Sequence, residues 1–122
     1  MDIVLWSISG LLALMFLAAG GLKIIRSRAE LQKDVAYVED FSDGQVKAIG
    51  GLEVAGALGL ILPKALGIAE ILTPLAALGL FLTMVGAAIT HIRRDEMPMI
   101  IMNIILGLLA LLVALARFGI FA

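Results

Sequence analysis

Four long apolar stretches, separated by short polar segments, organise this sequence. A membrane-spanning helix needs about 20 predominantly apolar residues, with a range of roughly 17–25. The stretches that approach this length are residues 3–22, 46–62, 66–90 and 98–120. The second is the shortest, but Ser42 and Gln45 precede it in the S-x-x-Q spacing of a capping box. The pattern predicts one all-α domain over residues 1–122, an integral membrane four-helix bundle.

Two connections between the predicted helices carry further structural signals. Residues 26–45 form a polar segment in which Leu31, Val35 and Val38 repeat at helical spacing. This spacing predicts a short amphipathic helix at the membrane interface, and a solvated loop is the alternative. Before the third span, the pair Thr73–Pro74 can restart the helix and leave a short shoulder ahead of it.

The composition indicates that most of the protein surface contacts the lipid bilayer. The chain is 62% hydrophobic and 16% charged, whereas soluble domains are about 45–50% apolar and about 25% charged. A net charge of −1 argues against nucleic acid as a partner. The absence of cysteine excludes disulfides and thiolate metal sites in this chain, and the sequence offers no metal-ligand cluster.

The basic residues predict an orientation. Seven of the nine lysines and arginines lie in or beside residues 23–47 and the loop after the third span. The positive-inside rule then places both connections in the cytoplasm and both chain termini outside the plasma membrane. Whichever way the protein is inserted, these two connections share one side.

Ionisable groups in hydrocarbon cost roughly 2.5–3.5 kcal/mol each on insertion scales, so they face protein interiors and find partners. The polar candidates within or beside the spans are Lys23, Glu53, Glu70, His91, Asn103 and Arg117. Glu53 lies roughly 12 Å of helix rise inside its span, and Lys23 ends the first span on the same side. We therefore expect a Lys23–Glu53 pair, and a second pair between Glu70 and Arg117 at the opposite side. No catalytic residue is assigned.

The other candidates have plainer interpretations. His91 at the membrane boundary is typical of an interfacial anchor, and Asn103 can be a polar end of a tightly packed helix. On the second span, Gly51, Ala55 and Gly59 form a ridge of small residues on the face opposite Glu53. Such ridges let helices approach closely, so we expect a homodimer to cover the ridge.

Several segments together resemble the DoxX-like family of small membrane proteins. The segment "FLAAGGLKI" (16–24) is similar to the F-x-x-A-G-x-x-K end of that family's first helix. The segment "KAIGGLEVAGALGLILP" (47–63) resembles its second-helix pattern, K-x-I-G-x-x-E-x-x-G-A-x-G-L-x-x-P. Segments 72–80, 84–96 and 103–119 are similar to the third helix, the basic loop and the last helix. The resemblance covers nearly the whole chain.

The resemblance implies a four-helix membrane protein, and directs attention to Lys23, Glu53 and His91. Some family members are associated with thiosulfate:quinone oxidoreductase activity or with oxidative-stress complexes, and distant relatives include sterol-isomerising EXPERA proteins. With no cysteine, thiol-linked electron transfer here would need another subunit or a bound quinone.

Four hypotheses follow from the residues and the resemblance. The favoured one is an accessory subunit that binds a quinone or another lipophile and docks a soluble redox partner on its cytoplasmic loops. The second is transport of protons or a small solute by a homodimer. The third is isomerisation of a lipophilic substrate, with Glu53 acting together with His91 or Lys23. The fourth is purely structural, with the Lys23–Glu53 pair acting as polar glue.

Overall fold

The computed structural model describes residues 2–26 and 41–119, and within them the chain forms helices and connections with no strand. The four long helices are α1 (Asp2–Ile25), α3 (Asp43–Leu66), α4 (Leu72–Arg93) and α5 (Met97–Arg117). Each is long and apolar enough to cross a membrane. The predicted all-α membrane bundle is therefore confirmed. The predicted amphipathic helix falls largely on residues 27–40, which lie outside the described part of the chain.

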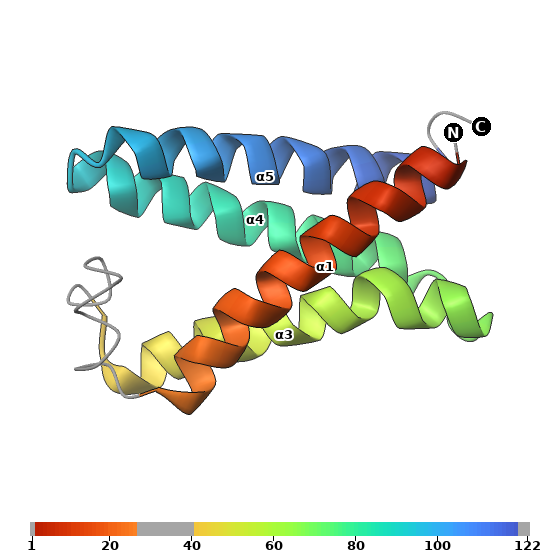
Figure 1. Cartoon of the computed structure of the whole chain (residues 1–122), viewed down its shortest axis with the longest axis horizontal. Coiled ribbons are helices and arrows are strands. Elements are labelled where there is room, and N and C mark those ends of the chain that lie inside the picture. Colours follow the sequence, from red (N-terminus) through yellow and green to blue (C-terminus); the bar gives the residue numbers. More distant parts are fainter. Residues whose placement is uncertain (1, 27–40, 120–122) are drawn as a thin grey trace.

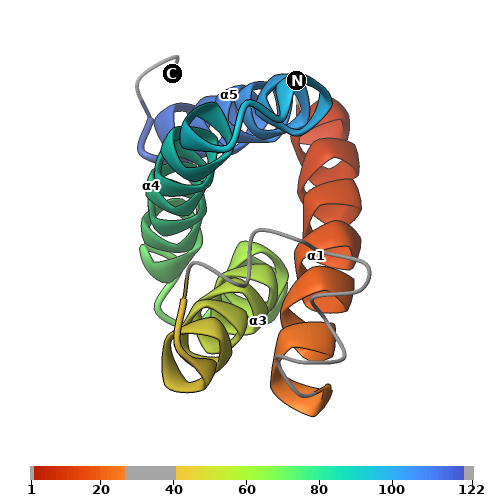
Figure 2. The ribbon, with the colours of Figure 1, turned by 90° about the vertical axis from the view of Figure 1, so that its left-hand side faces the viewer.

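The helices pack as two pairs joined through a third contact (Figures 1 and 2). Helix α1 packs along α3, α4 packs along α5, and the α3–α4 contact joins the pairs, whereas α1 and α5 touch much less. The start of α1 and the end of α5 lie together at one end of the bundle. The end of α1, the start of α3 and the α4–α5 connection lie at the other end. The helix ends that flank residues 27–40 thus lie at the same end of the bundle as the α4–α5 connection.

Polar side chains satisfy backbone groups at the end of α1 and at the start of α3. Gln45 N donates to Ser42 Oγ at 3.1 Å, and Ser42 N donates to Gln45 Oε1 at 2.9 Å, which forms the predicted capping box. The Lys47 ammonium donates to the Ile24 carbonyl at 2.9 Å. It thereby satisfies one of the last carbonyls of α1, which have no partner within their own helix.

The boundary between α3 and α4 differs from the expected one. Helix α3 continues through Pro63 to Leu66, and Gly67 then ends it in the left-handed conformation, with φ 65°. Helix α4 begins at Leu72, so the prediction that the third span starts at residue 66 was wrong. The physical reason is the left-handed glycine cap, followed by a restart at Thr73–Pro74.

The same boundary contains an interhelical hydrogen bond that compensates for Pro63. A proline has no N–H, so the carbonyl four residues earlier, that of Gly59, loses its helical donor. The buried Thr73 hydroxyl donates to this Gly59 oxygen at 2.9 Å. Because an unsatisfied carbonyl is costly in an apolar environment, Thr73 permits α3 to remain helical past Pro63.

The core lies in the middle of the bundle and is almost entirely apolar. Its fully buried side chains come from all four helices and include Leu12, Phe16, Leu60, Leu80 and Val113. Because this layer separates the two ends of the bundle, each end can be described as a site of its own.

Candidate functional site

The predicted Lys23–Glu53 ion pair is present near the end of α1. Lys23 Nζ lies 2.6 Å from Glu53 Oε1, and the two residues are only 8% and 3% exposed. Glycines make this approach possible: a Cβ atom on Gly50 would lie 2.7 Å from both the Gly20 carbonyl oxygen and Lys23 Cβ. The bare glycine backbones therefore bring α1 and α3 close enough for the two charged side chains to meet.

His91 lies near the end of α4 and is also buried. Its Nδ1 lies 2.8 Å from Oε1 of Glu96, the residue that precedes α5. When the imidazole is neutral, a carboxylate at Nδ1 selects the tautomer with the proton on Nδ1, which leaves Nε2 as the acceptor. The contact therefore fixes the orientation and the tautomer of the histidine.

Asn103, on α5, has an incomplete set of hydrogen bonds. It is 7% exposed, and its Nδ2 has no hydrogen-bond partner among residues 2–26 and 41–119. Leaving a buried donor unsatisfied costs about 1–3 kcal/mol. A buried amide with a spare donor is therefore destabilising, and a ligand that offers an acceptor would remove that cost.

Lys23, Glu53, His91 and Asn103 line one cavity of about 210 Å³, to which all four helices contribute. The remaining lining is apolar: Met15, Phe16, Ala19, Met84, Ala87, Met99, Met102 and Leu106. We call this space the polar cavity. Glu53, Met84 and Ala87 also line a second space of about 320 Å³ between α3 and α4, here called the middle cavity. The two cavities therefore share a wall.

The second predicted pair does not form. Glu70 lies on the exposed α3–α4 connection, with its Oε1 3.2 Å from Lys64 Nζ. Arg117 reaches the start of α1, where its Nη1 lies 2.9 Å from Asp2 Oδ1 and its guanidinium lies 5.4 Å from the Trp6 ring centre. The prediction of a Glu70–Arg117 pair was wrong because each residue has a nearer partner of opposite charge.

Comparison with known proteins agrees with this architecture. The sequence profile of the DoxX-like family matches residues 7–113, which is most of the chain. This chain belongs to the DoxX-like family. No curated protein and no solved structure matches it. The four apolar helices and the family together make this DoxX-like protein a multi-pass membrane protein.

Sequence analysis of the DoxX-like chain missed two parts of the site. One is Glu96, which was not among the polar candidates although it lies five residues after His91. The other is the methionine lining: four of the six methionines of the chain border the polar cavity. Met99, Met102 and Asn103 do share one face by helical spacing, and that spacing was the available signal.

The two faces of α3 differ in what covers them. Gly50, Glu53 and Leu60 are buried within the chain, whereas Ala55, on the opposite ridge, is exposed. A Cβ atom on Gly59 would lie 2.6 Å from Ala76 Cβ, so this end of the ridge packs against α4. One end of the ridge therefore packs against α4 of the same chain. The homodimer that was expected to cover the ridge remains a prediction.

Proposed function

We propose that this DoxX-like protein is an accessory membrane subunit that binds a lipophile with a carbonyl head group, such as a quinone, in the polar cavity. The observation that carries the proposal is the unsatisfied Asn103 amide, which lies in a cavity that also contains the Lys23–Glu53 pair and His91. A small number of convergent polar groups in an otherwise apolar cavity is the usual layout of a small-molecule site.

The donor set favours an uncharged ligand with oxygen acceptors. The Asn103 Nδ2 is a neutral donor, and the Lys23 ammonium is a cationic donor whose charge Glu53 already balances at 2.6 Å. A carbonyl oxygen can accept from such donors without bringing a new net charge into the membrane, where an unbalanced charge is costly. A quinone ring carries two such oxygens on an apolar ring.

The apolar lining suits a flat ring. Phe16 provides an aromatic face, and methionine thioethers pack favourably against rings because they are flexible and polarizable. The polar cavity holds about 210 Å³ and the adjoining middle cavity about 320 Å³. Together they reach the roughly 300–1,000 Å³ that is typical of ligand sites.

The test compares Asn103→Leu with Ser9→Ala in lipid nanodiscs. The Ser9 hydroxyl is also buried without a hydrogen-bond partner in the described part of the chain, but it does not line the polar cavity, so it is a matched control. We expect Asn103→Leu to weaken binding of decylubiquinone roughly fivefold, as the loss of one hydrogen bond would. Its thermal stability should not fall, because an unsatisfied donor is removed. Ser9→Ala should bind as the wild type does. Equal binding by all three proteins, or no binding by the wild type, would contradict the proposal.

A second candidate, isomerisation of a lipophilic substrate, is favoured by the His91–Glu96 contact. An imidazole oriented by a carboxylate can accept a proton at Nε2, and Glu53 lines the same cavity. Turnover of a sterol substrate that is lost in His91→Phe, with decylubiquinone binding retained, would favour this candidate.

A further inference from the structure

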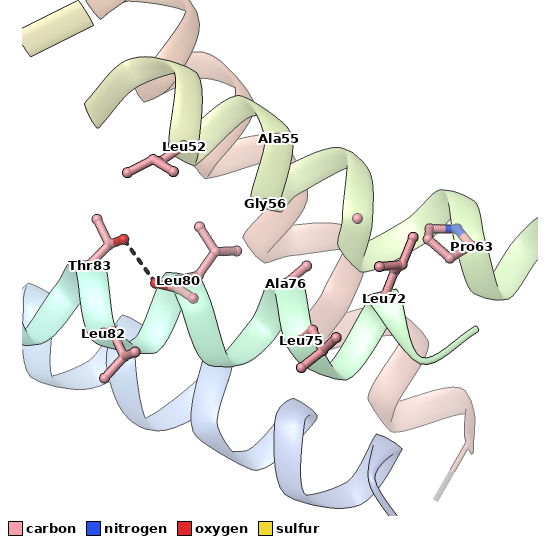
Figure 3. A pocket seen from close by; sticks show the side chains of 12 residues that line it. Leu52, Ala55, Gly56, Pro63, Leu72, Leu75, Ala76, Leu80, Leu82 and Thr83 are labelled. Carbon is pink, nitrogen blue, oxygen red and sulfur yellow. Dashed lines mark hydrogen bonds between the residues drawn. The ribbon is translucent and has the colours of Figure 1, made fainter. Parts of the chain in front are cut away.

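A groove of about 690 Å³ lies between α3 and α4. Figure 3 shows it running from Leu52 and Thr83 at one end to Pro63 and Leu72 at the other. From Leu72 to Thr83 this is roughly 16 Å of helix rise. We call this surface the α3–α4 groove.

Small residues form the floor of the groove, and exposed leucines form its rims. Gly56, Gly59 and Ala76 lie along the α3–α4 contact, whereas Leu52, Leu75 and Leu82 are exposed at its edges. Because both helices span the membrane, the groove opens sideways into lipid. A hydrocarbon chain is an occupant that matches this apolar, lipid-facing surface.

The groove connects to the polar cavity through shared walls. Leu52 and Thr83 line both the groove and the middle cavity. Glu53, Met84 and Ala87 line both the middle cavity and the polar cavity. The three spaces thus follow one another along α3 and α4, from the lipid-facing groove to the buried polar groups.

We propose that the ligand is a long-tailed amphiphile whose hydrocarbon tail lies in the α3–α4 groove while its carbonyl head group occupies the polar cavity. This inference rests on the proposed function and adds the class of ligand and its path of entry from the bilayer. The tail gains little hydrophobic energy by leaving lipid for the groove, because both are apolar. The role of the groove is to let a tailed head group reach the cavity without displacing packed side chains.

Two substitutions add bulk to the walls of the groove at positions with open space or exposure. A Cβ atom on Gly79 would meet no atom within 4 Å, and Ala55 on the opposite wall is exposed. Gly79→Leu and Ala55→Leu therefore place bulk in the groove. The matched control is Gly51→Leu on α3, where a Cβ atom also meets nothing and which lines none of the three spaces.

The experiment measures two ligands in nanodiscs: decylubiquinone, and the same dimethoxy-methyl-benzoquinone ring without its alkyl chain. We expect Gly79→Leu and Ala55→Leu to weaken binding of decylubiquinone roughly tenfold, the size of a typical overpacking penalty. Binding of the tail-less ring should stay within about twofold of the wild type. Gly51→Leu should bind both ligands normally, which controls for the added leucine on α3, and nanodiscs without protein control for partitioning into the bilayer.

The outcomes separate the two proposals. If the tail-less ring binds the wild type but the groove variants bind decylubiquinone normally, the groove does not hold the tail and only this inference is overturned. If the groove variants weaken both ligands equally, they act through the fold and the inference is again contradicted. If neither ligand binds the wild type, the proposed function fails, and this inference fails with it.

Discussion

The two ends of the bundle hold ion pairs of different kinds. At one end, Lys23 and Glu53 meet within the protein, with side chains only 10% and 4% exposed. At the other end, Lys64 and Glu70 meet at 3.2 Å with side chains 38% and 51% exposed. The first pair borders a cavity, whereas the second joins the last turn of α3 to the connection that follows it.

The difference shows why the buried end is the candidate site. An exposed ion pair contributes about 0–1 kcal/mol and is screened by salt. A buried pair must overcome the desolvation of both charges, and it is weak evidence for a stabilising role. A buried pair beside a cavity and an unsatisfied amide thus points to ligand binding more than to stability. Substitutions at the buried pair should therefore change stability and ligand binding more than substitutions at the exposed pair.

Removing only the carboxylate of the buried Lys23–Glu53 pair should change the free energy of unfolding most. Glu53→Leu leaves the Lys23 charge buried without its carboxylate, which should lower the free energy of unfolding by about 3–5 kcal/mol. The double variant Lys23→Met with Glu53→Leu should recover most of this stability, because it replaces both charges by apolar groups. Thermal unfolding in detergent measures both effects.

The same double variant distinguishes a ligand site from polar glue. We expect it to be folded but to have lost decylubiquinone binding, since two of the polar groups that line the cavity are gone. If the double variant folds and binds the ligand as the wild type does, the pair serves assembly alone.

Widening the α1–α3 contact should have the next largest effect. A Cβ atom on Gly20 would lie 2.6 Å from the Gly50 carbonyl oxygen, so Gly20→Ala must push the helices apart and should cost about 1–3 kcal/mol. Gly21→Ala is the control, because a Cβ atom there meets nothing. Equal unfolding temperatures for the two variants would contradict the close approach that positions Lys23 against Glu53.

Removing the hydroxyl that compensates for Pro63 should have a moderate effect. Thr73→Val leaves the Gly59 carbonyl without its donor and should lower the free energy of unfolding by about 1–3 kcal/mol. Thr73→Ser retains the donor and should be less harmful. Infrared spectroscopy of a carbon-13 label at the Gly59 carbonyl should show the lost hydrogen bond in Thr73→Val and not in Thr73→Ser.

The exposed pair should matter least. Lys64→Met should change the free energy of unfolding by less than about 1 kcal/mol and leave ligand binding unchanged. A loss of stability as large as that of Glu53→Leu would remove the contrast between the two ends of the bundle.

Much of the architecture could be predicted from hydrophobic length alone, because the bilayer sets the length of a spanning helix. The Lys23–Glu53 pair was predictable because a carboxylate so deep in a span requires a partner on the same side. The Glu70–Arg117 pair failed because the choice between partners at a helix end depends on tertiary distance. Asp2 and Lys64 were nearer, and charge patterns alone do not show this.

The end of α3 and the details of the site could not be predicted from the sequence. Pro63 looks like a stop signal in sequence, but the Thr73 hydroxyl satisfies the carbonyl it leaves open, and that contact exists only after α4 has folded back. The shared cavity likewise required the structure. Helical spacing predicts which face of its own helix each polar residue occupies. It does not predict how the helices cross, and this crossing brings the four polar faces together around one cavity.

Photolabelling in nanodiscs with a quinone that carries an azide on its ring, followed by peptide mapping, tests directly whether the head group binds in the polar cavity. We predict labels on the residues of the polar cavity, chiefly Met84, Met99 and Met102. Added decylubiquinone should compete with the azide and reduce this labelling. The Asn103→Leu variant should be labelled less, and Ser9→Ala as the wild type. Labels that spread over the lipid-facing residues of all four helices, without competition, would contradict a head-group site in the polar cavity.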